Sequence, residues 1–501
     1  MDIINNLMIG FATALSPANL AYCFMGVLLG TLIGVLPGIG PVSAIAMLLP
    51  ATYALPPVAS LIMLAGIYYG AQYGGSTTAI LINLPGESAS VVTTLDGHQM
   101  ARQGRAGVAL ATAALASFFA GTIATLILAL FAPPLATLAL KFNSHEYFSL
   151  MVLGLVGSIV LASGSLLKGV GMVFLGLLLG CVGTDVETAK ERFTFGIPEL
   201  SDGFGFVILA MGIFGLGEVI RNLEDQRVRE VVSRKIAGLM PTRTDLKRMI
   251  GSSVRGTALG SVLGVLPGGG AVLASFAAYS LESRVAKPPE GFGNGAIEGV
   301  AAPEAANNAG AQTSFIPMLT LGIPSNPVMA LMIGAMLIQG IQPGPLVIQQ
   351  QPGLFWGIIA SMWIGNMMLL VLNLPLVGMW ARVITAPYHL LYPAILVFSA
   401  IGVLTISNKE VDVYFMALFG VLGYVFAKLE CEPAPLLLAF ILGPMMEENF
   451  RRAMQLSQGD PTSFLTRPIS ATLLVIAVLG LLTAISPAIS RKREEAFKEQ
   501  P

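Results

Sequence analysis

Two long stretches of the chain contain no Asp, Glu, Lys or Arg. They cover residues 3–86 and 305–381, which are 84 and 77 residues long. A transmembrane helix needs about 20 apolar residues, so each stretch can hold roughly three crossings or their re-entrant equivalents. Because backbone groups cannot stay unpaired in hydrocarbon and these runs are helix-length without strict alternation, we expect helices rather than barrel strands. The predicted fold class is all-α, a polytopic transmembrane protein.

The overall composition supports the same fold class. Of the 501 residues, 55% are hydrophobic and 11% are charged, and the formal net charge is −1. Soluble proteins carry about 25% charged residues, so this composition excludes an ordinary soluble enzyme, a disordered chain and a nucleic-acid binder. With the shorter apolar runs included, we predict about ten to fourteen membrane elements, some of them short or broken.

The most polar internal segment divides the chain into two halves. Residues 221–250 contain eight basic and four acidic side chains, which predicts a cytoplasmic loop by the positive-inside rule. We therefore expect a first transmembrane repeat at 1–220, this basic loop, a second repeat at 251–490 and a polar C-terminal tail at 491–501. Three further arginines also favour the cytoplasm, which leaves the orientation of the last span open; they are Arg451, Arg452 and Arg467.

The two halves share a glycine-rich motif. The segments Gly30–Pro41 (GTLIGVLPGIGP) and Gly260–Ala271 (GSVLGVLPGGGA) have seven identities at constant spacing. We interpret the GxxxG pair in each segment as a helix-packing strip. The Pro-Gly pairs at 37–38 and 267–268 predict helix breaks inside uncharged sequence, with a turn in a connecting loop as the alternative.

A second matched element follows in each half. Gly-Ala-Gln occurs at 70–72 and again at 310–312, and an apolar stretch then leads to a proline turn at 83–88 or 322–327. Internal duplication is typical of secondary transporters, in which broken helices meet near the middle of the membrane. We predict two sequence-related repeats and, as a hypothesis, an inverted arrangement of the two.

Polar side chains are concentrated beside these motifs, in residues 73–78 and 303–314. Free N–H groups at half-helix N-termini suit a carboxylate, and side-chain oxygens with freed carbonyls suit an alkali cation. A polar clamp between helices is the alternative for any single residue. Glu87 and Glu304 either lie at the water boundary or are buried and carry a proton.

These patterns give two sets of candidate residues. The predicted substrate-binding residues are Pro37, Gly38, Gly40, Gly75, Ser76, Thr77, Pro267, Gly268, Gly270, Pro324, Ser325 and Asn326. The predicted ion-coupling residues are Glu304, Asn307, Asn308 and Gln312. The sequence contains no Walker A, HExxH or nucleophile-elbow motif, so we expect no catalytic residue, no cofactor and no metal beyond a transported Na⁺.

Four segments together resemble the large membrane subunit of tripartite tricarboxylate transporters, the TctA family. They are residues 30–41, residues 69–87 (YGAQYGGSTTAILINLPGE), residues 264–271 (GVLPGGGA) and residues 303–326 (PEAANNAGAQTSFIPMLTLGIPSN). The resemblance spans nearly the whole chain. It implies a bacterial inner-membrane symporter subunit that takes up citrate or a related carboxylate with Na⁺ or H⁺. It also implies two partners, a small membrane subunit and a periplasmic solute-binding protein. A passive channel or scaffold subunit without ion coupling is the alternative.

Overall fold

The computed structural model confirms the predicted helical fold. It describes residues 3–36, 39–161, 165–185, 187–224, 238–268, 270–384 and 388–485. Within these ranges the strands are β1 (Gly183–Thr184) and β2 (Glu191–Arg192), which pair antiparallel. The middle of the basic loop and the C-terminal tail lie outside the described residues.

The helices follow the apolar runs of the sequence. Those of the first half are α1 (Ile3–Ala14), α2 (Pro17–Gly34), α3 (Pro41–Tyr53), α4 (Pro57–Ile82), η1 (Ser88–Ser90), α5 (Val91–Thr93), η2 (Thr94–His98), η3 (Ala101–Arg105), α6 (Ala106–Ala139), α7 (Ser144–Leu161), α8 (Leu166–Gly180), η4 (Pro198–Leu200), α9 (Phe206–Ala210), η5 (Met211–Leu216) and α10 (Gly217–Glu224). Those of the second half are α11 (Arg243–Val265), α12 (Gly270–Val285), α13 (Glu298–Thr313), α14 (Phe315–Leu321), α15 (Pro327–Ile338), α16 (Val347–Gln350), α17 (Pro352–Asn373), α18 (Val377–Val383), α19 (Tyr388–Ser407), α20 (Val411–Lys428), α21 (Ala434–Leu456), α22 (Ser463–Thr466) and α23 (Pro468–Ile485).

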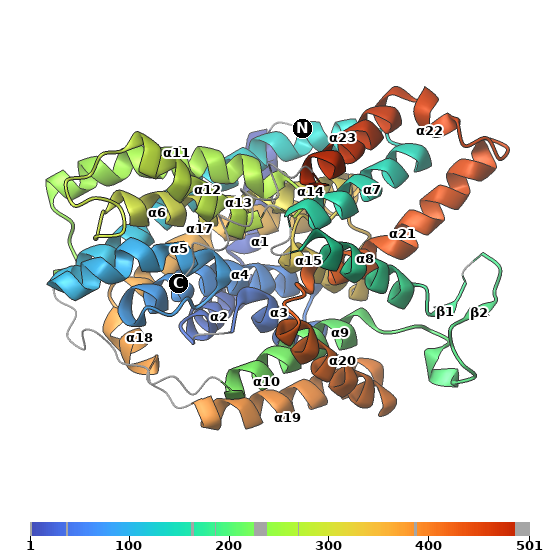
Figure 1. Cartoon of the computed structure of the whole chain (residues 1–501), viewed down its shortest axis with the longest axis horizontal. Helices are drawn as coiled ribbons and strands as arrows, with labels where there is room; N and C mark the ends of the chain where they lie inside the picture. Colours follow the sequence, from blue (N-terminus) through green and yellow to red (C-terminus); the bar gives the residue numbers. More distant parts are fainter. Residues whose placement is uncertain are drawn as a thin grey trace.

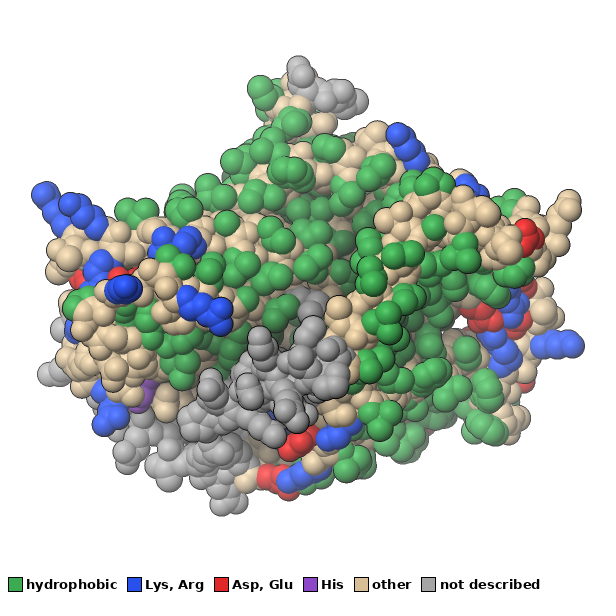
Figure 2. Space-filling view, turned by 45° about the horizontal axis from the view of Figure 1, so that its top comes forward, with side chains coloured by type: hydrophobic (Ala, Val, Ile, Leu, Met, Phe, Trp, Pro, Cys, Tyr) green, Lys and Arg blue, Asp and Glu red, His purple; other side chains and the backbone are tan. Residues whose placement is uncertain are grey.

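The described part of the chain is built to cross a membrane several times. Six of its helical segments are long and apolar enough to span a bilayer, and five shorter apolar helices of 10–17 residues accompany them. In Figure 1 the helices α6 and α11 run along the longest axis of the molecule. Figure 2 shows hydrophobic side chains across its middle, with charged side chains mainly toward the two ends. The protein is therefore a multi-pass membrane protein.

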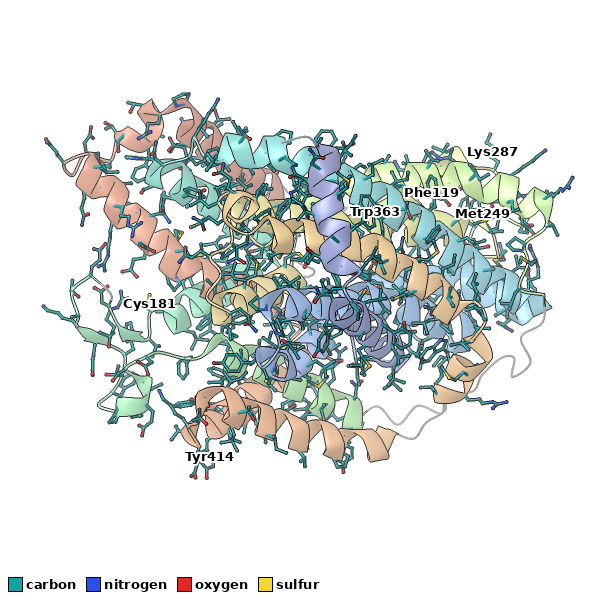
Figure 3. All side chains as sticks on the ribbon, turned by 180° about the vertical axis from the view of Figure 1, so that it is seen from behind. Phe119, Cys181, Met249, Lys287, Trp363 and Tyr414 are labelled. Carbon is teal, nitrogen blue, oxygen red and sulfur yellow. The ribbon has the colours of Figure 1, made fainter. Side chains whose placement is uncertain are left out.

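The two ends of this axis carry different segments. Figure 1 places the start of α11 at one end, and β1, β2 and α22 at the other. In Figure 3, Met249 and Lys287 lie toward one end and Cys181 toward the opposite one. Arg451 and Arg467 lie at the end of β1 and α22, where they pair with Asp185 at 3.1 Å and with Glu146 at 2.8 Å. The three arginines are thus at the other end from the start of α11, and each lies beside a carboxylate.

Both GxxxG segments pack against a helix of their own half. A Cβ atom at Gly30 of α2 would lie 2.4 Å from the carbonyl oxygen of Ile67 in α4. A Cβ atom at Gly260 of α11 would lie 2.3 Å from the carbonyl oxygen of Ala306 in α13. Such backbone contact leaves no room for a larger residue. The two halves also pack across each other, with α6 along α13 and α17 along α4.

Candidate functional site

Two proline turns, one in each half, end in a helix cap. The backbone is left-handed at Asn83 (φ 57°) after α4, and at Gly322 (φ 72°) after α14. Glu87 then caps η1 in a capping box with Ser90, and Asn326 caps α15 by accepting a hydrogen bond from the backbone of Met329 at 3.0 Å. Carboxylate and amide oxygens suit this position because they accept from free N–H groups of the first helical turn.

The turn in the second half lies on the break between α11 and α12. The helix stops at Val265, as the Pro-Gly pair predicts, and Gly268 has a φ of +77° that favours glycine. Its N–H donates to the carbonyl oxygen of Ser325 at 2.7 Å. A Cβ atom at Gly270, the first residue of α12, would lie 3.3 Å from the Cβ of Asn326. The N-termini of α12 and α15 therefore lie close together around Asn326.

The turn in the first half has comparable surroundings. A Cβ atom at Gly86 would lie 2.2 Å from the carbonyl oxygen of Gly34, at the end of α2. Another at Gly75, in α4, would lie 2.8 Å from the Cγ of Glu87. The equivalent break, at Pro37 and Gly38, lies outside the described residues. The α2–α3 connection resumes at residue 39, and Gly40 caps α3 with open space around it.

Helix α13 joins the two halves through side-chain hydrogen bonds. Asn307 donates from Nδ2 to Glu87 Oε1 at 3.0 Å, and Asn308 donates from Nδ2 to Ser117 Oγ of α6 at 2.7 Å. Both amides are 1% exposed, so these bonds are shielded from water. Residues from the second half thus bind residues of the first half in the interior of the molecule.

Glu304, one turn before Asn308, is held by hydroxyl groups. Its carboxylate accepts from Ser76 Oγ at 2.7 Å, from Thr93 Oγ1, and from Ser117 Oγ at 3.4 Å. The side chain is 1% exposed, and among the described residues neither Glu304 nor Glu87 forms an ion pair with Lys or Arg. An ionised carboxylate without a paired cation is costly at this depth. Such a group favours a bound proton or metal cation.

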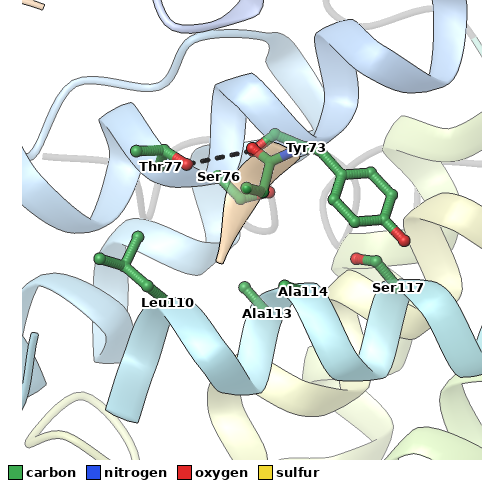
Figure 4. A pocket seen from close by; sticks show the side chains of 8 residues that line it. Tyr73, Ser76, Thr77, Leu110, Ala113, Ala114 and Ser117 are labelled. Atoms are coloured by element: carbon green, nitrogen blue, oxygen red, sulfur yellow. Dashed lines mark hydrogen bonds between the residues drawn. The ribbon is translucent and has the colours of Figure 1, made fainter. Parts of the chain in front are cut away.

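Figure 4 shows a small cavity beside Ser76 and Ser117, two residues that bind Glu304, and we call it the Glu304 cavity. It is lined by Tyr73, Ser76, Thr77, Leu110, Ala113, Ala114, Ser117 and Asn373. Two of these residues, Ser76 and Ser117, also donate to the Glu304 carboxylate. The cavity has room for about one water-sized ligand, which suits a dehydrated cation and is too small for a carboxylate with several acid groups.

Several buried amides have atoms without a hydrogen-bond partner in the described structure. They are Gln72 Nε2 and Oε1, Asn307 Oδ1, Gln312 Oε1, Asn326 Nδ2 and Asn373 Oδ1. Buried polar groups are otherwise almost always hydrogen-bonded, so unpaired ones mark places where a ligand or water is expected. Three of these six atoms belong to residues 307–326, two belong to the matching Gln72, and one belongs to Asn373, which lines the Glu304 cavity.

The structure brings most of the predicted site residues into two groups. Ser76, Thr77 and Asn308 lie around the Glu304 cavity. The other group joins Pro267, Gly268, Gly270, Ser325 and Asn326 through the contacts at the α11–α12 break, with Pro324 buried in the same turn. Gln312 is buried with an unpartnered oxygen, and among the described residues no side-chain hydrogen bond joins it to either group.

Sequence reasoning missed Thr93, Ser117 and Tyr68 as site residues. The first two donate to Glu304 but stand in runs without a recognisable motif. Tyr68 lies beside the side chains of Gln72 and Asn326. Tyr68 stands two residues before the repeated Gly-Ala-Gln, and this position is the sequence feature that could have indicated it as a site residue.

Comparison with known proteins gives a family match over most of the chain. A model described as the tripartite tricarboxylate transporter TctA family matches residues 20–438. An Agrobacterium vitis protein described as an uncharacterized 52.8 kDa protein in the TAR-I ttuC′ 3′ region is 61% identical over 500 residues, which covers 100% of both chains. A second protein of that organism, described as uncharacterized and from the TAR-II ttuC′ 3′ region, is 60% identical over 240 residues, 48% of this chain and 99% of the relative. No solved structure matches.

Proposed function

Because the chain belongs to the tripartite tricarboxylate transporter TctA family, we propose that it is the large, substrate-translocating subunit of such a transporter. In this proposal it moves citrate or a related carboxylate into a bacterial cell together with Na⁺ or H⁺. It lies in the inner membrane beside a small membrane subunit, and a periplasmic solute-binding protein delivers the substrate.

The observation that supports an anion site best is the meeting of two helix N-termini at Asn326. Each N-terminus presents free N–H groups and the positive end of a helix dipole, which favour a carboxylate without a fixed Lys or Arg. The unpartnered Asn326 Nδ2 adds a donor, and it is buried with only 7% of the residue exposed. We assign substrate contact to this turn and to the adjoining Pro267, Gly268 and Gly270.

The Glu304 cavity supports an accompanying cation site. Hydroxyl and carboxylate oxygens are hard ligands that suit Na⁺, and Ser76, Thr93 and Ser117 supply three of them around Glu304. We assign ion coupling to Glu304, with support from Asn307, Asn308 and Gln312. No ATP-binding motif is present in the sequence, so an ion gradient supplies the energy in this proposal.

The same contacts support a mechanism of alternating access. The hydrogen bonds that α13 makes to Glu87 and Ser117 cross from one half of the chain to the other. A ligand that binds beside them changes the free-energy difference between the arrangement with these bonds and one without them. We propose that one half moves against the other in this way, with the halves as two related repeats, in inverted topology by hypothesis.

Uptake by the reconstituted three-subunit transporter tests this function. Radiolabelled citrate should accumulate in vesicles only when an inward Na⁺ or H⁺ gradient is present. Asn326→Ala and Asn307→Ala should each lower uptake about tenfold or more, because a lost hydrogen bond to a charged group costs about 1.5–3 kcal/mol. Asn308→Ala should lower uptake as well, because the Ser117 hydroxyl that donates to Glu304 loses its own donor. Asn449→Ala is the matched control, since Asn449 of α21 donates only to the Met445 carbonyl of its own helix.

Two results would contradict the proposal. Citrate that equilibrates without any ion gradient would indicate a passive channel. If the three site variants transport as the control does, with equal amounts inserted in the membrane, the assigned residues are wrong.

A further inference from the structure

The caps after the two proline turns differ in one chemical respect. Asn83, Pro85 and Glu87 have the spacing of Gly322, Pro324 and Asn326, and both turns start with a left-handed residue. The first cap is therefore a carboxylate where the second is a neutral amide. An anion already occupies the cap position in the first half, whereas the second half leaves a positive helix end that a ligand can neutralise.

Both caps lie against helix α4. The Tyr68 phenol of α4 lies beside the side chains of Gln72, Ser314 and Asn326. Glu87 lies against the same helix, where a Cβ atom at Gly75 would be 2.8 Å from the Glu87 Cγ. Asn326 Nδ2 and both amide atoms of Gln72 have no partner there in the described structure. A substrate carboxylate that binds these donors would share this buried region with the carboxylate of Glu87. Two negative charges in such surroundings repel each other strongly unless one is neutralised.

The contacts of Glu87 indicate which cation can neutralise it. Its carboxylate accepts from the backbone N–H of Ser90 and from Asn307 Nδ2. These N–H donors cannot serve as further ligands for Na⁺, which prefers oxygen atoms, so we assign a proton rather than a metal ion to this carboxylate. The hydroxyl oxygens around Glu304 suit a metal ion better.

The amide of Asn307 can serve both protonation states of Glu87. In the structure its Nδ2 donates to the carboxylate, while its Oδ1 has no partner. A half-turn of the amide exchanges the two atoms, because they have nearly the same size and shape. Oδ1 would then accept the proton of a neutral Glu87 carboxyl. No side chain other than Asn307 needs to move for this exchange.

On the basis of the proposed function, we propose that Glu87 takes up one proton when the substrate carboxylate binds at Asn326. The proton moves from water to a carboxylate oxygen of Glu87, and it leaves again when the substrate leaves. The titratable groups that face Glu87 are Tyr68 on α4 and Glu304 on α13. By linkage, protonation and anion binding strengthen each other by the same factor. Glu87 thus makes substrate binding proton-dependent, separately from the cation site at Glu304.

Citrate binding to the purified full-length protein tests this inference. The ratio of parent affinity to Glu87→Gln affinity should fall as pH rises from about 6 to 8, by up to about tenfold per unit for one linked proton. Because both proteins receive the same citrate, protonation of citrate itself cancels in this ratio. Glu218→Gln in α10, outside the site, is the matched control and should behave as the parent does.

Two further variants keep the test decisive. Glu87→Asn creates the cap that Asn326 already provides in the other half, so it should fold even if Glu87→Gln does not, and it should show the same loss of pH dependence. Asn326→Asp should weaken citrate binding at least tenfold, because it places a carboxylate in the second cap as well.

The possible results separate this inference from the proposed function. Parental pH dependence in folded Glu87→Gln or Glu87→Asn overturns the inference, and so does loss of citrate binding in both. In either case the parent still binds citrate and the proposed function stands. If the parent neither binds nor transports citrate at any pH, the proposed function itself is wrong.

Discussion

The Ser76 hydroxyl of α4 donates to Glu304 Oε2 of α13 at 2.7 Å, although 228 residues separate the two in sequence. This hydrogen bond joins the first half of the chain to a carboxylate of the second half. It is buried, with Ser76 3% and Glu304 1% exposed. In a buried site the strength of such a bond depends on the charge of the carboxylate. Binding of a cation at Glu304 should therefore change the strength of this hydrogen bond between the two halves.

Removal of this hydroxyl should weaken cation-driven uptake. We expect Ser76→Ala to reduce uptake about 5- to 100-fold, because Glu304 loses a donor worth about 1–3 kcal/mol. Ser60→Ala is the matched control, since Ser60 is also buried on α4 but its hydroxyl has no partner in the described structure. Radiolabelled citrate uptake at several Na⁺ concentrations measures the effect, which should be largest at low Na⁺. Equal uptake by the two variants would remove Ser76 from the cation site.

The parts of this site that depend on local chemistry were predictable from sequence. The break at Pro267 and Gly268 follows from a missing donor and a missing side chain, and the structure ends α11 two residues earlier, at Val265. The proline turn that occurs in both halves indicates Asn326 as a substrate-binding residue. Proline, glycine and turn residues act over a few positions, so their effects can be recognised without knowledge of the fold.

Long-range contacts account for what was missed. Thr93 of α5 and Ser117 of α6 reach Glu304 across 211 and 187 residues, because both helices pack against α13. A single hydroxyl in an apolar helix gives no sign of the partner it will meet. Likewise the sequence left open whether Glu87 and Glu304 lie at the water boundary. The structure buries both, at 7% and 1% exposure.

Close backbone packing at Gly260 should make this position sensitive to one added methyl group. A Cβ atom there would lie 2.3 Å from the Ala306 carbonyl oxygen, so Gly260→Ala must push α11 and α13 apart. We expect a loss of about 1–3 kcal/mol of stability and a lower apparent Tm in detergent. Gly171→Ala in α8 is the control, because nothing lies within 4 Å of its added Cβ. An unchanged Tm for Gly260→Ala would contradict the observed helix contact.

Arg248, near the N-terminal end of α11, should stabilise the fold in a pH-dependent manner. It donates to both oxygens of Glu298 at 2.8 and 2.7 Å and to both oxygens of Glu290 at 3.0 and 2.7 Å. The hydrogen bonds from Arg248 lower the pKa of Glu290, which lies in the loop after α12. A carboxyl with a lowered folded-state pKa stabilises the fold above its unfolded pKa, about 4.3, and that contribution is lost as pH falls through the folded value.

Arg248→Ala should therefore lower the apparent Tm at pH 7 and weaken its decline in acid. Two carboxylates lose their common partner, which costs about 1–3 kcal/mol at a half-buried site. Arg452→Ala is the comparison, because Arg452 is 61% exposed and pairs with Glu448 of the same helix turn. Thermal unfolding between about pH 4 and 7 measures both. If the two variants have the same pH profile, Arg248 does not hold this loop.

The last prediction concerns which end of the molecule faces the cytoplasm. Phe195 follows β2 and is 85% exposed, and Met240 precedes α11 and is 88% exposed. The two lie toward opposite ends of the long axis, given the positions of β2 and α11 in Figure 1. The basic residues of the central loop assign Met240 to the cytoplasmic side.

In a background with Cys23, Cys181 and Cys431 replaced by alanine, a membrane-impermeant maleimide should label Phe195→Cys in intact spheroplasts. It should label Met240→Cys only after permeabilisation. The reverse pattern would invert the orientation and place the arginine-containing end beside α22 in the cytoplasm, and labelling of both in intact cells would show that the two positions are not on opposite sides of the membrane.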